Sequence, residues 1–235
     1  MKKILLMGAL LFLISFHSSC DNEELTIISN SHSKKTRTIL IDSENPFDEL
    51  GEIHNVLFDL YSPPPNFQKD IEVIANEVNY LLSNYTNLQP STITIDSLFV
   101  EWFEEIIYYP EQSLDTIISQ SELSTLAETK LLNLIEITSG TTTTDINEAL
   151  LEIISFEENI IMDIILLTKE KEIILMVSAI AKYSIYDNGD RKDKDWDLSV
   201  GNIVATINGA VNNNHNALLF ALIAKIYLNN LRTSE

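Results

Sequence analysis

The chain has 235 residues, with 35 Asp and Glu against 15 Lys and Arg, so its formal net charge is −20 at pH 7. This charge disfavours nucleic acid as a partner, because phosphate binding draws most of its strength from Lys and Arg. It also disfavours adsorption onto anionic lipid surfaces. A single cysteine excludes a disulfide framework within the chain, and the length suffices for one sizeable core or two small ones.

Residues 1–19 show the three regions of a secretory signal peptide. Two lysines open the segment, an apolar run covers residues 4–16, and two serines precede Cys20. The run is shorter than the roughly 20 apolar residues that a transmembrane helix needs. We therefore expect an exported protein that loses residues 1–19; the alternative is a buried N-terminal helix.

The residues Ser18-Ser19-Cys20 resemble a bacterial lipoprotein signal. In that family the cysteine receives a diacylglyceryl thioether and becomes the acylated N-terminus. The match covers residues 1–20 and departs from the family at His17, where an aliphatic residue is usual. The resemblance implies a lipid anchor at Cys20, which two or more acyl chains would hold firmly in a membrane. The competing interpretation is a free or intermolecular thiol.

The residues after the cysteine, Cys-Asp-Asn-Glu-Glu, resemble the signal that sends Bacteroidota-type lipoproteins to the outer face of the outer membrane. A solvated acidic tether is the alternative interpretation. Residues 20–45 are polar and lack a core period, so we expect the lipidated cysteine to be followed by a flexible tether. The mature chain would hold 13 basic and 35 acidic residues, a formal charge of about −22.

From residue 46 the pattern predicts an all-α domain over residues 46–235, a helical bundle of about seven or eight helices. Asn45 is the expected cap of the first helix, which carries His54 on its apolar face. The clearest helix follows over residues 71–85, where apolar residues recur at spacings of three and four.

The middle of the chain predicts further helices with less regular starts. Residues 91–96 favour a strand by β-branching, but Asp96 can instead cap a helix that Pro110 ends. After a polar break near residues 119–125, an apolar stripe is expected to run from Ile146 to Ile164. The segment at residues 168–172, Thr-Lys-Glu-Lys-Glu, is expected to reverse the chain or interrupt the helix.

The last predicted element is a helical hairpin over residues 198–230, rich in small residues. Gly201, Ala205 and Gly209 lie four apart on one face, a spacing that lets helix backbones approach closely. Each arm has about a dozen apolar residues, too few to span a bilayer. This favours a buried hairpin over a membrane-inserting one.

The same region faintly resembles exported Bacteroidota helical proteins of unknown function. Those proteins have a Ser-x-x-Tyr motif, a charged loop with Trp and a Gly/Ala-rich helical tail, and the resemblance implies no activity. The matching positions here are Ala181, Tyr183, Ser184, Trp196, Gly201 and Gly209. The tail departs from that group by having Asn and Leu in place of repeated Gly.

Two candidate sites carry carboxylates. Asp193, Asp195 and Asp197 fit the first three ligand positions of a calcium loop. Leu198 stands where the loop needs Gly, so a solvated connection is favoured and no metal or other cofactor is expected. Glutamates beside aromatic residues could serve glycoside hydrolysis or sugar binding; these are Glu101, Trp102, Glu104, Glu105, Tyr108 and Tyr109.

The tripeptides that begin at Asp96 and Asp115 resemble the O-glycosylation acceptor of exported Bacteroidota proteins, which implies modification at Ser97 and Thr116. Both tripeptides also suit helix starts.

No Gly-rich phosphate loop, nucleophile elbow or Cys/His pair occurs in the sequence. The sequence therefore favours a non-enzymatic binding module at the outer membrane. Its partners would be the bilayer, through the anchor, and a protein or envelope polymer. The alternatives are a membrane-active protein that uses the C-terminal hairpin and a glycan or cell-wall hydrolase.

Overall fold

The computed structural model describes residues 44–61, 70–88, 91–140, 146–188 and 200–232. In these ranges the chain forms α-helices and no strand, so the predicted all-α class is confirmed, with nine helices against the expected seven or eight. The helices are α1 (Asp48–Leu60), α2 (Ile71–Tyr85), α3 (Ser97–Tyr108), α4 (Pro110–Gln120), α5 (Thr125–Gly140), α6 (Ile146–Met162), α7 (Thr168–Asn188), α8 (Val200–Asn212) and α9 (Asn214–Arg232).

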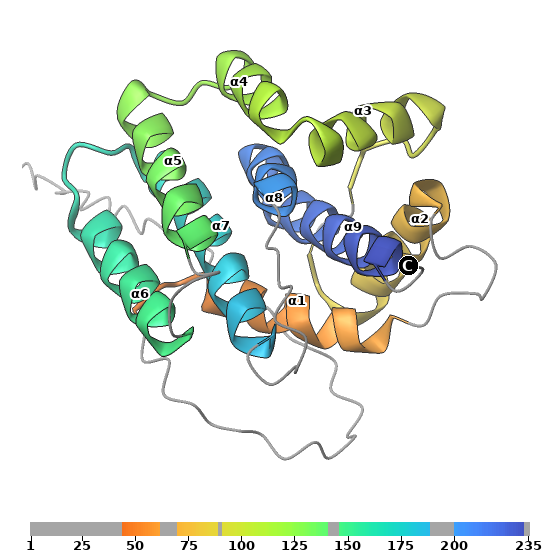
Figure 1. Cartoon of the computed structure of the whole chain (residues 1–235), viewed down its shortest axis with the longest axis horizontal. Coiled ribbons are helices and arrows are strands. Elements are labelled where there is room, and N and C mark those ends of the chain that lie inside the picture. Colours follow the sequence, from red (N-terminus) through yellow and green to blue (C-terminus); the bar gives the residue numbers. More distant parts are fainter. Residues whose placement is uncertain (1–43, 62–69, 89–90, 141–145, 189–199, 233–235) are drawn as a thin grey trace, which may run out of the picture.

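Helices α7, α8 and α9 form the centre of the domain, and the others pack around them (Figure 1). α8 and α9 pack along each other as a hairpin, while α1, α5 and α6 pack on α7. α2 packs on α9, and α3 and α4 pack on α8. Segments from both ends of the described chain therefore share one core.

The C-terminal hairpin lies inside this core, as the sequence predicts. Residues 217–224 of α9 are apolar, and none is more than 1% exposed. A helix that is apolar on all sides is stable only when other elements surround it. In the part of the chain that the structure describes, no helix combines the length and the apolar character needed to cross a membrane.

Capping residues fix the starts of α2 and α3. The Asp70 carboxylate accepts a hydrogen bond from the Val73 N–H at 3.1 Å. Asp96 accepts from the N–H groups of Leu98 and Phe99, which satisfies two donors that the helix leaves free. The helix interpretation of Asp96 is therefore correct, and residues 91–96 form no strand.

The predicted start of α1 is wrong. The helix begins at Asp48 with Phe47 as its cap, and no side chain caps it. Asn45 accepts from the Phe47 N–H through its Oδ1, while its amide nitrogen points into the core between α6 and α7. The last residue of the predicted tether thus belongs to the folded domain.

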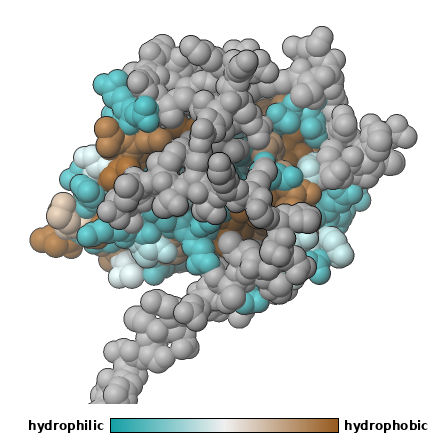
Figure 2. Space-filling view, turned by 90° about the horizontal axis from the view of Figure 1, so that it is seen from below, coloured by the Kyte–Doolittle hydropathy of each residue, from teal (hydrophilic) through white to brown (hydrophobic). Residues whose placement is uncertain are grey.

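The predicted end of α6 is also wrong. The helix ends at Met162, the chain reverses over residues 163–167, and residues 168–172 begin α7. Ile164, expected in the buried stripe, is 96% exposed. Hydrophobic atoms protrude at the left edge of the molecule in Figure 2, the side on which this connection lies in Figure 1.

The small-residue stripe of α8 faces two different helices. A Cβ on Gly201 would lie 3.2 Å from the Ile107 backbone of α3. A Cβ on Gly209 would collide with the backbone of Asn216 and Ala217 at the start of α9. The close approach predicted from the spacing is present, divided between α3 and α9.

Candidate functional site

A pocket of about 550 Å³ opens between α3, α4 and α8, which meet at the top of the domain in Figure 1. Its size falls within the range of small-molecule sites. The residues that line it are Trp102, Glu105, Ile106, Tyr109, Gln112, Ser113, Thr116, Ile117, Gln120, Ser121, Asn208, Val211 and Asn212.

Trp102 is held in the pocket wall by an aromatic cluster. Its ring centroid lies 5.4 Å from that of Phe220 in an edge-to-face arrangement, and 5.7 Å from that of Phe99. The ring centroid of Phe103 lies 6.2 Å from that of Trp102 and completes the cluster. Such pairs contribute about 0.5–1.5 kcal/mol each beyond their buried area, so the indole is fixed before any ligand arrives.

Apart from the aliphatic side chains of Ile106, Ile117 and Val211, the remaining walls are polar and almost uncharged. Hydroxyl and amide side chains come from successive turns of α4 and from Asn208 and Asn212 of α8. Among the described residues of the lining, Glu105 alone carries a charge. The buried amide nitrogen of Asn208 makes no hydrogen bond in the described structure, so turning this side chain toward a ligand would break no hydrogen bond at that atom.

The predicted carboxylate cluster is divided by the fold. Glu105 lines the pocket with Trp102 and Tyr109, whereas Glu101 and Glu104 are exposed outside its lining. Glycoside hydrolysis generally uses two carboxyl groups that flank the scissile bond. The described pocket walls offer one, so this geometry supports sugar binding better than hydrolysis.

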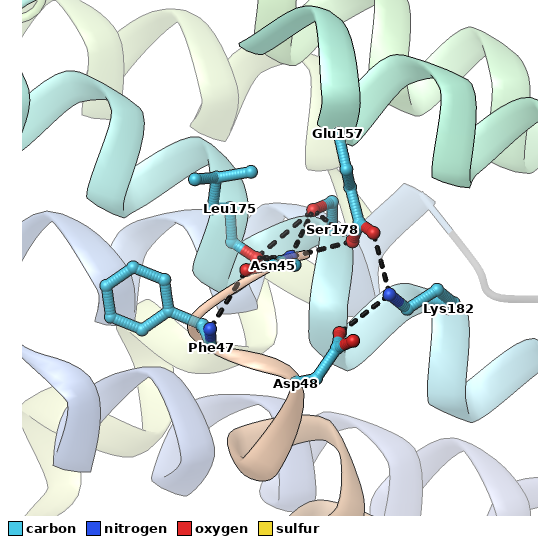
Figure 3. Close-up of polar contacts among 7 residues, drawn as sticks. All are labelled: Asn45, Phe47, Asp48, Glu157, Leu175, Ser178 and Lys182. Carbon is cyan, nitrogen blue, oxygen red and sulfur yellow. Dashed lines mark hydrogen bonds and ion pairs between the residues drawn. The ribbon is translucent and has the colours of Figure 1, made fainter. Parts of the chain in front are cut away.

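A second polar cluster is buried between α1, α6 and α7 (Figure 3). The Lys182 ammonium lies 2.6 Å from the Glu157 carboxylate and 2.6 Å from that of Asp48. The side chains of Lys182 and Glu157 are 0% and 1% exposed, and that of Asp48 is 18% exposed. Two carboxylates thus compensate one buried cation.

Neutral groups complete this network. The Asn45 amide donates to Glu157 at 2.7 Å and to the Leu175 carbonyl at 2.9 Å. The Ser178 hydroxyl donates to the same Glu157 oxygen at 2.8 Å. None of these residues lines the pocket, and burial excludes a substrate from the Lys182 ammonium. The network therefore joins the start of the domain to α6 and α7.

His54 is fully buried beside Lys225 and Ser184. Burial, together with the positive charge of Lys225, holds the pKa of His54 well below 6.5. Lys225 donates to the Asn55 side chain at 3.2 Å and lies 4.3 Å from the centroid of the Phe58 ring. His54 is thus a neutral core residue, consistent with its predicted place on the apolar face.

The modification candidates are exposed at different places. Ser97 is the first residue of α3, beside the cap Asp96. Thr116 lies on α4 in the pocket lining, and its hydroxyl donates to the Gln112 carbonyl at 3.0 Å. Glycosylation at both residues stays a prediction. A glycan on Thr116 would stand at the pocket.

The proposed calcium ligands Asp193, Asp195 and Asp197 lie outside the described residues, as does Cys20. Within the described residues, no group of three or more His, Cys, Asp or Glu side chains is placed to hold a metal ion.

Sequence reasoning missed most of the pocket. It identified Trp102, Glu105 and Tyr109, but not the amide side chains opposite them, such as Gln112, Gln120 and Asn208. A weak signal existed, because Gln112, Thr116 and Gln120 recur every four residues on α4 and so share a face.

No family model, curated protein or solved structure matches this chain.

Proposed function

We propose that the protein is an exported lipoprotein, anchored by acyl chains on Cys20, whose helical domain is a non-enzymatic binding module. Its ligand is an uncharged, hydroxyl-rich molecule such as a glycan segment of the cell envelope, held in the α3–α4–α8 pocket. The observation that carries this proposal is a fixed indole, Trp102, in a wall of neutral hydroxyl and amide groups.

The aromatic cluster supports a stacking role for Trp102. Sugar rings present C–H faces that pack on aromatic rings, and a ring already held in place loses little entropy on binding. Phe220 and Phe99 pack against the indole, and Trp102 also lines the pocket.

The neutral walls support an uncharged ligand. In a chain with a net charge of −20, a pocket lined by one carboxylate among many hydroxyl and amide groups is a local exception. Amide side chains both donate and accept hydrogen bonds, as sugar hydroxyls do. A cationic ligand would find one counter-charge in the described lining, and an anionic ligand would find none.

Tryptophan fluorescence provides the binding test. The chain has two tryptophans, so Trp196→Phe leaves Trp102 as the only reporter. We expect the emission of a Cys20→Ser/Trp196→Phe chain to change saturably on titration with neutral oligosaccharides of glucose, mannose or N-acetylglucosamine. Equimolar sorbitol controls for viscosity and osmolality.

A matched pair of variants locates the site. Glu105→Gln changes the pocket lining, while Glu104→Gln makes the same change at an exposed neighbour outside it. We expect Glu105→Gln to weaken binding about tenfold, as loss of a charge-assisted hydrogen bond does, and Glu104→Gln to leave it unchanged. The absence of saturable binding to every oligosaccharide, or equal effects of the two changes, would contradict the pocket assignment.

The anchor has its own test. Mass spectrometry of the native protein should show an N-terminal Cys20 that carries acyl chains, and Cys20→Ser should move the protein from the detergent phase to the aqueous phase. An unmodified thiol on a chain that retains residues 1–19 would contradict lipidation. Because this test does not involve the pocket, it separates the two parts of the proposal.

A further inference from the structure

The connection between α6 and α7 exposes an unusual amount of apolar surface. In residues 162–167, here named the α6–α7 tip, Met162 is 69% exposed, Ile164 96%, Ile165 75% and Leu167 65%. Only Leu166 turns inward, at 6% exposure. Single exposed apolar residues are common on protein surfaces, but a cluster of four within six residues indicates an interaction site.

Side-chain carboxylates pair three backbone N–H groups of the tip. The Asp163 carboxylate accepts hydrogen bonds from the N–H groups of Ile165 and Leu166, at 2.8 and 3.2 Å. Glu170 accepts from the Leu167 N–H at 2.9 Å, and the Lys171 ammonium donates to the Ile161 carbonyl at 2.8 Å. N–H groups that are already paired within the protein lose little when water is removed, which favours contact with a lipid environment.

In the part of the chain that the structure describes, the lysines that reach the surface lie near this tip. The structure describes five basic side chains, and two of them, Lys182 and Lys225, are buried. The other three are Lys169 and Lys171 at the start of α7 and Lys130 on α5, whose ammonium lies 4.0 Å from Asp163. Asp163 and Glu170 are engaged in the tip, and Glu158 and Glu172 are exposed nearby, so these three lysines and four acids nearly balance in charge.

Apolar side chains at the extremity with lysines behind them match the two layers of a membrane interface. The apolar groups suit the acyl boundary and the ammonium groups suit the lipid phosphates. The overall charge of −20 opposes a strongly anionic bilayer, so zwitterionic lipids are the better match. A protein partner would instead need a complementary groove.

We propose that the α6–α7 tip inserts into the surface of a zwitterionic lipid bilayer, with Met162, Ile164, Ile165 and Leu167 at the acyl boundary and the three lysines at the phosphates. This contact is independent of the pocket. Together with the proposed anchor at Cys20, it would hold the domain in one orientation on the membrane.

Depth-dependent quenching tests the proposal with the acylated full chain in phosphatidylcholine vesicles. Cys20 is the only cysteine, and acylation consumes its thiol, so Ile164→Cys introduces a unique site for an environment-sensitive fluorophore. Leu98→Cys is the matched control, because Leu98 is 72% exposed on α3, at the opposite side of the domain from the tip in Figure 1.

We expect spin-labelled lipids to quench the fluorophore at position 164 at least about threefold more than the fluorophore at position 98. Replacing Ile165 and Leu167 by Asn in the Ile164→Cys chain should remove most of that difference, with an unchanged circular dichroism spectrum. Equal quenching at both positions, or none at position 164, would overturn the proposal while leaving the anchor intact.

Two further outcomes are decisive. A chain that does not float with the vesicles would overturn both the tip contact and the anchor. A fluorescence change at position 164 that depends on protein concentration and needs no lipid would assign the tip to contact between copies of this chain, and would also overturn the proposal.

Discussion

The Lys182 ammonium lies 2.6 Å from a carboxylate oxygen of Glu157, and both side chains are buried. These residues come from neighbouring helices, α7 and α6, and Asp48 of α1 supplies a second carboxylate 2.6 Å from the same ammonium. The contact therefore joins three helices at one atom. Removing charges from water is costly, so each member of such a cluster depends on the others.

Lys182→Met should destabilise the protein strongly. It removes the cation and leaves the buried Glu157 carboxylate without its counter-charge, a change that typically costs about 3–5 kcal/mol. Urea denaturation followed by circular dichroism would show a lower midpoint. Lys169→Met, the same substitution at an exposed site of the same helix, should change the free energy of unfolding by less than about 0.5 kcal/mol.

A second substitution should partly reverse this loss. Glu157→Gln, added to Lys182→Met, removes the stranded charge but keeps an oxygen that can accept from Asn45 and Ser178. The double variant should therefore be more stable than Lys182→Met alone. If the double variant is less stable, the interpretation of the network as coupled buried charges is wrong.

Asn45→Ala should also be costly, although Asn45 lies outside the helices. The substitution removes two buried hydrogen bonds, one to the Glu157 carboxylate and one to the Leu175 carbonyl, at a combined cost of about 1–3 kcal/mol. Asn76→Ala is the matched control, because Asn76 is exposed and its amide donates to the Glu72 carbonyl one turn away. Similar urea midpoints for the two variants would show that Asn45 does not fasten the start of the domain.

Acidification should destabilise the protein through His54. Burial and Lys225 keep its pKa well below 6.5 in the folded state, so the unfolded chain takes up the proton first as the pH falls. The stabilisation is complete above pH 6.5 and is lost as the pH falls toward the folded pKa. Between the folded and unfolded pKa values, each histidine of this kind lowers the free energy of unfolding by up to about 1.4 kcal/mol for each pH unit of acidification.

Chemical denaturation between pH 7.5 and about 5.5 would measure this slope. Burial also lowers the pKa of His215, so it contributes in the same direction. His54→Gln should reduce the slope, whatever its effect on stability at pH 7.5, and His54→Gln with His215→Gln should reduce it further. A slope unchanged by His54→Gln would show that His54 is protonated in the folded protein.

The helices could be predicted because their apolar residues recur with a helical period. Of the predicted seam of α2, Ile71, Ile74, Ala75, Val78 and Leu82 are buried, and Leu81 and Tyr85 are half-buried. The helical period predicted the wrong end for α6, because apolar residues continue on both sides of the turn. The run around Ile164 contains neither Gly nor Pro to mark that turn. That reversal depends on Asp163 and Glu170, whose carboxylates accept bonds from backbone N–H groups of the turn.

The pocket was less accessible to sequence reasoning because α8, which is distant in sequence from α3 and α4, completes it. Trp102 and Glu105 attracted notice as an aromatic–acid pair, but Asn208 reaches the same space from α8, about 100 residues later. The buried network escaped for the same reason. Nothing near Lys182 in the sequence distinguishes it from an exposed lysine, and only the packing of α1 and α6 reveals its carboxylates.

The two glycines of α8 should respond differently to the same substitution. A Cβ at position 209 would collide with the Asn216 and Ala217 backbone, which cannot move aside as a flexible side chain does. Overpacking of this kind costs about 1–3 kcal/mol or more, against roughly 1 kcal/mol that Ala gains over Gly in a helix. Gly209→Ala should therefore lower the urea midpoint.

Gly201→Ala is the matched control on the same helix. Its Cβ would lie 3.2 Å from the Ile107 backbone, so a shift of a few tenths of an ångström between α3 and α8 accommodates it. The gain in helix propensity offsets most of that cost, and we expect a change of less than about 1 kcal/mol. Equal urea midpoints for the two variants would contradict this prediction. The backbone at Asn216 would then have to move aside to admit the methyl group at position 209, which would mean that the α8–α9 turn is not tightly packed.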